Sequence, residues 1–176
     1  MTRLALAVVA ACSPAPPEVA CPATVPAALA PTADQDLAFV WHGEGVQIYA
    51  CANGAWTFAL PRAALTTRAG DPAGTHFAGP SWRAVDGSSA VGRKVAEAPG
   101  APAAIPWLAL VVSSHDGTPG VLADVTAIQR LETTGGIAPA TGCDAAHPDA
   151  RVEVPYTANY YFYRKQPGAT NRRCGG

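Results

Sequence analysis

The 176-residue sequence has few charged residues and no excess of either sign. Charged side chains make up 14% of the chain, and 12 basic residues nearly balance 13 acidic ones, for a formal net charge of −1. A chain without a basic field offers no footprint for a phosphate backbone, so we expect no nucleic-acid partner. No apolar run approaches the roughly 20 residues that a membrane-spanning helix requires.

The sequence also lacks the spaced motifs of common catalytic and cofactor sites. The sequence contains neither a Cys-x-x-Cys motif nor a His-Glu-x-x-His motif. We interpret the 4 histidines as solvated loop residues, although His42 and Glu44 could place two metal ligands on one strand face. Gly43-Glu44-Gly45 is not followed by the glycine of a dinucleotide-binding loop. No Gly-x-Ser-x-Gly nucleophile elbow is present. We therefore expect neither a metal nor a cofactor.

Residues 1–12 have the order of a bacterial lipoprotein signal. Arg3 supplies a positive charge, residues 4–11 are apolar without interruption, and Val9-Ala10-Ala11-Cys12 resembles a lipobox. We expect residues 1–11 to be a signal peptide and Cys12 to receive a diacylglycerol. The lipid would hold the exported protein at the membrane of the cell envelope, and without it the protein would be secreted.

The cysteine count fits this interpretation. There are 5 cysteines, so one is left over if the rest pair, and lipidated Cys12 would be that one. The other four allow three connectivities. We favour Cys51–Cys143, which would tie an early strand to a late loop, and Cys21–Cys174, which would join the two tails.

Composition divides the rest of the chain into three parts. Residues 12–36 are rich in proline and alanine and have no period, which predicts a semi-rigid tether. Residues 37–163 carry strand patterns and form the predicted domain. Residues 164–176 form a C-terminal tail.

Alternating apolar and polar residues predict short strands throughout this domain. Residues 37–42 and 46–51 alternate on either side of an expected turn at residues 43–45, and Asn53-Gly54 is a hairpin signal before a returning strand at residues 56–58. A short helical turn is expected at residues 61–65. Further strands are expected at residues 75–77, 82–85, 89–95, 105–112, 121–131 and 152–162.

The last of these segments has the clearest pattern. Its residues from Val152 to Phe162 alternate between two faces, with Tyr160 on the inner face and Tyr161 and Tyr163 on the outer one. Pro155 places it at an edge or next to a bulge. About seven to nine short strands without a long helix predict an all-β, single-domain β-sandwich or flattened barrel.

Seven ordered motifs support a family resemblance. They are GVQIYAC (45–51), GTHFAGPSW (74–82), DGS (86–88), IPWL (105–108), IQR (128–130), TGGIAP (134–139) and PYTA (155–158). The series resembles domain-of-unknown-function family 3455, which comprises exported bacterial and fungal proteins. The resemblance spans about residues 37–163 and implies one compact domain, but it implies no activity or catalytic residue.

One segment could carry chemistry. His76 and Asp86 are titratable, Trp82 offers a flat face between them, and the turn at Gly79-Pro80 could bring them together. His76 would then act as a general base oriented by Asp86, or as a metal ligand. The alternative, which we favour, is that His76 bonds to backbone and that Asp86 belongs to a simple turn.

Aromatic and basic residues suggest a binding surface instead. Trp82, Tyr161 and Tyr163 are candidates for contact with a glycan or small molecule, because ring faces stack on sugars. Arg130 could clamp a carboxylate ligand or form an ordinary ion pair. We therefore expect an exported, non-catalytic binding module, with a hydrolase or metal-assisted enzyme using His76 and Asp86 as the alternative.

Overall fold

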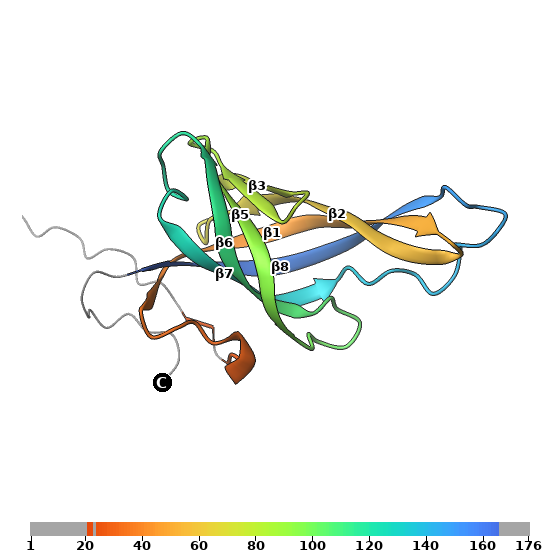
Figure 1. Ribbon diagram of the computed structural model, residues 1–176, viewed down its shortest axis with the longest axis horizontal. Helices are drawn as coiled ribbons and strands as arrows, with labels where there is room; N and C mark the ends of the chain where they lie inside the picture. The colour runs from red at the N-terminus through yellow and green to blue at the C-terminus, as the bar shows by residue number, and fades with distance from the viewer. Residues whose placement is uncertain (1–20, 23, 166–176) are drawn as a thin grey trace, which may run out of the picture.

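The chain folds as an antiparallel β-barrel that is closed in chain order, β1 to β8 (Figure 1). The structure, a computed structural model, describes residues 21–22 and 24–165. The elements are η1 (Ala27–Leu29), β1 (Gln35–Ala52), β2 (Ala55–Thr66), β3 (Pro72–Phe77), β4 (Ser81–Ala84), β5 (Ser88–Ala98), β6 (Trp107–Gly117), β7 (Val125–Gly135) and β8 (Arg151–Lys165). The predicted all-β class is confirmed, and of the two predicted arrangements the structure has the barrel.

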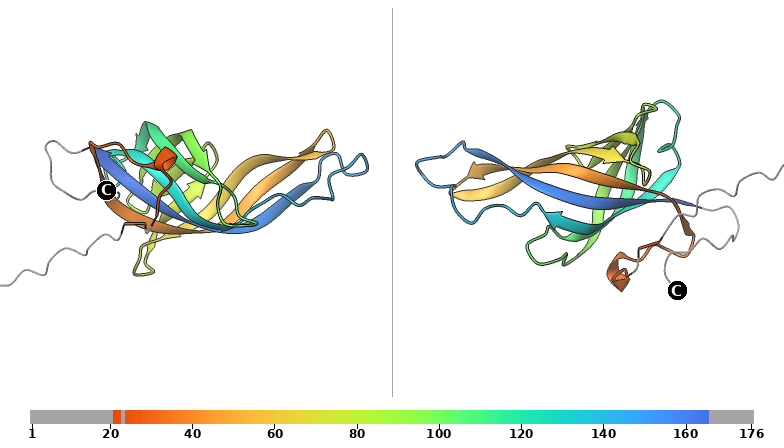
Figure 2. Two further views of the ribbon diagram at one scale, coloured as in Figure 1. Left: turned by 90° about the horizontal axis from the view of Figure 1, so that it is seen from below. Right: turned by 180° about the vertical axis from the view of Figure 1, so that it is seen from behind.

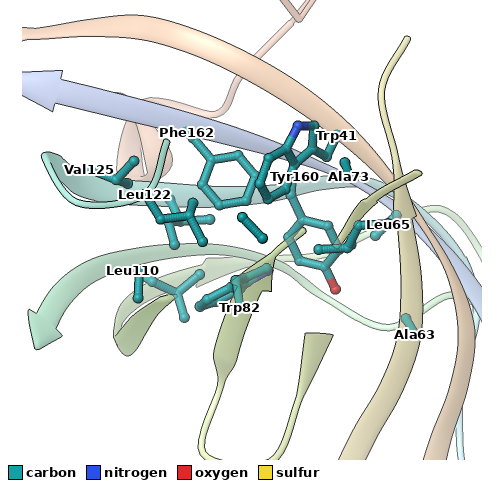
Figure 3. Close-up of a cluster of buried hydrophobic side chains, with 14 of the residues drawn as sticks. Trp41, Ala63, Leu65, Ala73, Trp82, Leu110, Leu122, Val125, Tyr160 and Phe162 are labelled. Carbon is teal, nitrogen blue, oxygen red and sulfur yellow. The ribbon is translucent and has the colours of Figure 1, made fainter. Parts of the chain in front are cut away.

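The alternation predicted for the last strand is confirmed by the burial of β8. Tyr156, Ala158, Tyr160 and Phe162 belong to the core inside the barrel. Figure 3 shows Trp41, Tyr160 and Phe162 gathered above Trp82 in this core. β8 pairs with β7 from Arg164 back to Tyr156, and Pro155 is the next residue, outside this pairing. This is the edge position expected of a residue without a backbone N–H.

The turn predicted at residues 43–45 is wrong, because β1 runs through it without a break for 18 residues. Gly43 and Gly45 serve close packing rather than chain reversal. A Cβ at Gly43 would lie 2.6 Å from the ring of Tyr160, and one at Gly45 would lie 2.5 Å from the Cα of Ala63. The absence of side chains here lets the neighbouring strands approach β1.

The prediction of a helical turn at residues 61–65 is also wrong. These residues belong to β2 and pair with Gln47 to Gly43 of β1. Pairing with a long strand outweighs the local helical tendency of this short segment. The hairpin signal before it is confirmed, since Asn53 and Gly54 have φ values of 52° and 75°, as a type I′ turn requires.

The other predicted strands correspond to β3, β4, β5, β6 and β7, with shifted ends. The largest shift of a single end is at β6, which continues to Gly117 instead of ending at residue 112. The strand predicted over residues 121–131 begins at Val125 in β7, because residues 121–124 form a turn. β1 and β8 are also longer than predicted, at 18 and 15 residues. They pair with each other along almost their whole length.

Parts of β1, β2 and β8 extend beyond the barrel as an arm, here defined as residues 46–62 and 151–155 (Figures 1 and 2). β3 pairs with β2 only from Ala63 onward, so the arm strands pair with one another alone. The predicted Cys51–Cys143 disulfide is confirmed and joins the arm to the loop between β7 and β8.

The segment before β1 packs on the outer face of the barrel. Leu29 is 1% exposed and lies in a second apolar cluster with Leu37, Leu131, Tyr161 and Tyr163. The Nε2 atom of Gln129 donates a hydrogen bond to the Leu29 carbonyl oxygen. Within the predicted tether of residues 12–36, the part around Leu29 is thus packed against the barrel.

Several predictions concern residues outside the described part of the chain. These are the signal peptide at residues 1–11, the lipidation site Cys12, the Cys174 half of the Cys21–Cys174 pair, and residues 166–176 of the predicted tail. Residues 164 and 165 belong to β8. Among the described residues, no helix is long and apolar enough to cross a membrane.

Candidate functional site

His76 lies on β3 inside the barrel, where it is 3% exposed. Its ring stacks on Trp82 with 4.5 Å between the ring centroids. Its Nδ1 atom lies 2.9 Å from the carbonyl oxygen of Ser81, which can only accept, so Nδ1 carries the proton. Burial lowers the pKa of His76 to about 4, because the imidazolium would lose its hydration. At neutral pH the side chain is an uncharged part of the core.

Asp86 lies in the turn between β4 and β5 and has a different set of partners. Its Oδ1 atom accepts hydrogen bonds from the backbone N–H and the hydroxyl of Ser88, and its Oδ2 atom accepts one from the N–H of Val121 at 2.7 Å. These bonds, led by the Ser88 hydroxyl, lower the pKa of Asp86. The structure does not pair Asp86 with His76, which corrects the interpretation of the two as an oriented base.

Two of the residues predicted to bind ligand are inaccessible. Trp82 and Tyr163 are each 1% exposed, and the Tyr163 hydroxyl donates to the Oε1 atom of Gln129 at 2.6 Å. Alternation places Tyr161 and Tyr163 on the outer face of β8, but the segment around Leu29 covers that face. Neither Trp82 nor Tyr163 can present its ring to a ligand, which corrects both predictions.

Arg130 points into the barrel from β7. It has the same inward orientation as Ile128, which is 0% exposed and part of the inner core. Its Nη2 atom donates a hydrogen bond to the carbonyl oxygen of Pro106 at 2.8 Å. It forms no ion pair with any residue that the structure describes, so the ordinary ion pair considered for it is not found there.

A groove of about 610 Å³ lies on the outer face of the barrel. Such a volume suits a small molecule. Its lining includes His42 from β1, Glu132 from β7, and Asn159 and Tyr161 from β8. Arg68, in the turn between β2 and β3, contributes a further side chain. The closure of the barrel brings these residues together from distant parts of the sequence.

Three of the groove side chains form a continuous chain of hydrogen bonds. The Nδ2 atom of Asn159 donates to the Oε2 atom of Glu132 at 2.5 Å, and the Asn159 Oδ1 atom lies 2.9 Å from the Nδ1 atom of His42. Because the amide oxygen can only accept, His42 Nδ1 carries the proton. In the neutral imidazole, Nε2 is then left as a hydrogen-bond acceptor.

The position of Glu132 depends on an irregularity in β7. The register between β7 and β8 shifts between Leu131 and Thr134, and Glu132 has a φ of 52°. A bulge of this kind redirects a side chain, and a left-handed non-glycine residue costs about 1 kcal/mol or more. The fold thus tolerates local strain at the residue whose carboxylate joins Asn159 to Tyr161.

Tyr161 reaches the groove through its hydroxyl group. The hydroxyl donates to the Oε2 atom of Glu132 at 3.1 Å. Burial raises the pKa of Tyr161, the Glu132 carboxylate raises it further, and Arg68 opposes the rise. The hydroxyl therefore remains protonated, and Arg68 supplies a positive charge near Tyr161. The groove offers hydrogen-bond donors and acceptors side by side.

Sequence patterns identified this site only in part. The sequence predicts the ring of Tyr161 as a ligand contact, but Tyr161 is 4% exposed and contributes its hydroxyl to the site instead. His42 is a sequence candidate only as a metal ligand. Asn159 lies two residues before Tyr161 in the same strand, so the alternating pattern places it on the same outer face. The sequence therefore contains a signal for Asn159. Glu132 and Arg68 carry no such signal, because one depends on a bulge and the other on a turn. Among the described residues, no group of three or more His, Cys, Asp or Glu side chains could hold a metal ion.

Comparison with known proteins identifies a family but no function. Residues 31–164 match the model of a family described as "Protein of unknown function (DUF3455)". No curated protein and no solved structure matches the chain.

Proposed function

This chain belongs to the family of proteins of unknown function DUF3455, and we propose that it is a non-catalytic binding module of the bacterial cell envelope. The outer groove is the binding site. Its ligand is a glycan or another small molecule rich in hydroxyl groups.

The observation that carries this proposal is the hydrogen-bond chain from His42 through Asn159 to Glu132. It fixes the orientation of all three side chains before a ligand arrives, which reduces the entropy lost on binding. In the neutral imidazole it leaves His42 Nε2 as one acceptor, the Glu132 carboxylate is a second, and Arg68 provides donors. A hydroxyl group both donates and accepts, so an array of hydroxyls matches this mixture of groups.

Export and lipid anchoring belong to the same proposal. They are supported by the order of residues 1–12 and by the Cys51–Cys143 disulfide. Disulfides persist mainly in oxidising compartments such as the bacterial periplasm and the cell exterior. Lipid at Cys12 would keep the groove close to the membrane surface.

The test is a printed glycan array probed with the purified domain, followed by calorimetric titration of the best oligosaccharide. Glu132→Gln keeps the shape of the side chain and removes its charge. We expect this variant to bind at least about tenfold more weakly, because a hydrogen bond to a charged group contributes about 1.5–3 kcal/mol.

The matched control is Glu153→Gln. Glu153 is an exposed carboxylate on the arm, paired with Arg62 at 2.6 Å, and it does not line the groove. Its replacement should leave the affinity unchanged. An array without any bound glycan, or equal weakening by both variants, would contradict the proposal.

A further inference from the structure

The end of the barrel next to the arm carries a partly buried positive charge. Arg130 lies opposite Tyr160 of β8 and Leu108 of β6 in the strand register. The bridge between Ala104 and Gly136 lies at the same end. Arg130 remains partly accessible, so this end of the barrel can be reached from solvent.

No carboxylate among the described residues neutralises this charge by direct contact. The Nη2 atom of Arg130 donates to the carbonyl oxygen of Pro106, while its buried Nε atom has no described acceptor. Glu97 exerts a weak electrostatic influence on Arg130. The Glu97 carboxylate is held by Lys94 at 2.6 Å and does not form an ion pair with Arg130.

Two polar groups near Arg130 also have hydrogen-bond donors that are not fully used. Gln47 is 2% exposed, and its Nε2 atom makes no hydrogen bond of good geometry with a described residue. Its side chain lies close enough to the Tyr156 hydroxyl to interact with it and to lower the pKa of Tyr156, against the larger effect of burial. The hydroxyls of Tyr156 and Tyr160 lie 3.0 Å apart, so one hydroxyl hydrogen fills that bond and the other needs a different acceptor. The Tyr49 hydroxyl is already used, since it donates to the Gly136 carbonyl oxygen at 2.6 Å.

These groups lie close together around Gly136. A Cβ added there would meet Tyr156 at 3.0 Å and Gln47 at 3.1 Å. Arg130 acts electrostatically on Tyr49, Tyr156 and Tyr160. Arg130, Gln47 and the tyrosine pair thus lie in the same part of the barrel and supply one cation, one amide N–H₂ group and one hydroxyl hydrogen.

Donors without acceptors and a partly buried cation without a counter-ion are both unfavourable. A buried donor that lacks an acceptor loses its hydration without replacement, and a charge removed from water requires a partner. We infer that the arm-side end of the barrel binds a small carboxylate anion, held by Arg130 and Gln47. A carboxylate carries a single negative charge and only accepts hydrogen bonds, which matches one guanidinium group surrounded by spare donors. A water molecule could accept the hydrogen bonds but would leave the charge uncompensated.

The test is thermal unfolding of the domain as sodium acetate replaces sodium chloride at constant ionic strength and pH 7. A ligand that binds only the native state raises the melting temperature with its concentration. We expect a rise on the order of 5 °C once acetate greatly exceeds its dissociation constant. Arg130→Met should abolish this rise, and Arg130→Lys should retain part of it.

A matched control separates the site from general effects of acetate. Arg164→Met removes another partly buried guanidinium, one that is paired with Asp124 at 2.7 Å, and it should keep the full acetate response. Gln47→Met tests the same site without altering its charge and should weaken the response. Arg130→Met should melt no lower than the wild type in chloride, because it removes an uncompensated charge.

Two results would overturn the inference. One is a wild-type melting temperature that is the same in acetate and in chloride. The other is an acetate response that persists in Arg130→Met, which would place the bound anion elsewhere. Neither result bears on the outer groove, because Arg130 and Gln47 do not line it.

Discussion

The imidazole of His76 packs against the indole of Trp82 and the ring of Tyr160, with ring centroids 4.5 and 5.1 Å away. Its one polar bond in the described structure is to backbone, at Ser81. Burial among aromatic rings favours the uncharged form, so the residue that the sequence offers as a candidate base contributes to stability instead. The same environment gives that contribution a pH dependence.

Between pH 7 and pH 5, His76 should make the domain less stable as the pH falls. Its native pKa of about 4 lies below the usual value of about 6.5, so the unfolded state binds more protons in this range. The stabilising contribution of His76 is complete at pH values above its pKa in the unfolded state. It declines as the pH falls toward its pKa in the native state. We expect a loss of about 2 kcal/mol by pH 5.

Urea unfolding of the wild type and of His76→Gln at both pH values would measure this effect. The amide can still donate to the Ser81 carbonyl oxygen, and the carboxylates titrate in both proteins, so their contributions cancel in the comparison. The stability gap between the two proteins should narrow by about 2 kcal/mol from pH 7 to pH 5. A gap that stays constant would show that burial does not shift the titration of His76.

At the scale of elements, glycine determines how closely β1 approaches its neighbours. A residue with a side chain does not fit at position 45 while β1 keeps its contact with β2. A Cβ atom there would overlap the Arg62 carbonyl oxygen and lie 2.5 Å from the Cα of Ala63. Both clashes are with backbone, which cannot rotate away. The two glycines that predict a turn in the sequence thus permit a continuous strand in the fold.

Gly45→Ala should lower the free energy of unfolding by about 3 kcal/mol, at the upper end of the usual cost of overpacking. Gly54→Ala is the matched control. Gly54 lies in the hairpin turn with a φ of 75° and nothing within 4 Å of an added Cβ, so only backbone strain of about 1 kcal/mol is expected there. Chemical denaturation of both variants measures the difference. Equal losses would argue against a close contact between β1 and β2.

At the scale of the whole molecule, the Cys51–Cys143 bridge spans 92 positions in the sequence. It fixes the loop between β7 and β8 to the arm. In the chain-entropy description, a loop of this length stabilises the fold by roughly 4.6 kcal/mol. A protein that relies on such a bridge benefits from maturing in an oxidising compartment, which connects the fold to the proposed export.

When the complete chain is expressed in a bacterium that processes lipoproteins, we expect a mature product that begins at lipidated Cys12. Intact-mass measurement and partition into detergent would detect the diacylglycerol. Cys12→Ser is the control and should remain in the aqueous phase without the added mass. Full-length, unacylated protein with reduced Cys51 and Cys143 would contradict both the export and the lipid anchor.

The sequence by itself determines the class of fold, because the period of two in its apolar residues and the turn at Asn53-Gly54 are local properties. The sequence also indicates the inward face of β8 and the oxidised state of Cys51 and Cys143. Each of these follows from residue types and their spacing along the chain.

Only the tertiary structure decides where the groove lies and which part of the outer face of the barrel is covered. His42 and Asn159 meet because β1 pairs with β8, 117 positions away, and Glu132 joins them through a bulge. Tyr163 is buried because the segment around Leu29 folds back over it. Alternation assigns a side chain to one of two faces, whereas burial depends on which distant segment packs against that face.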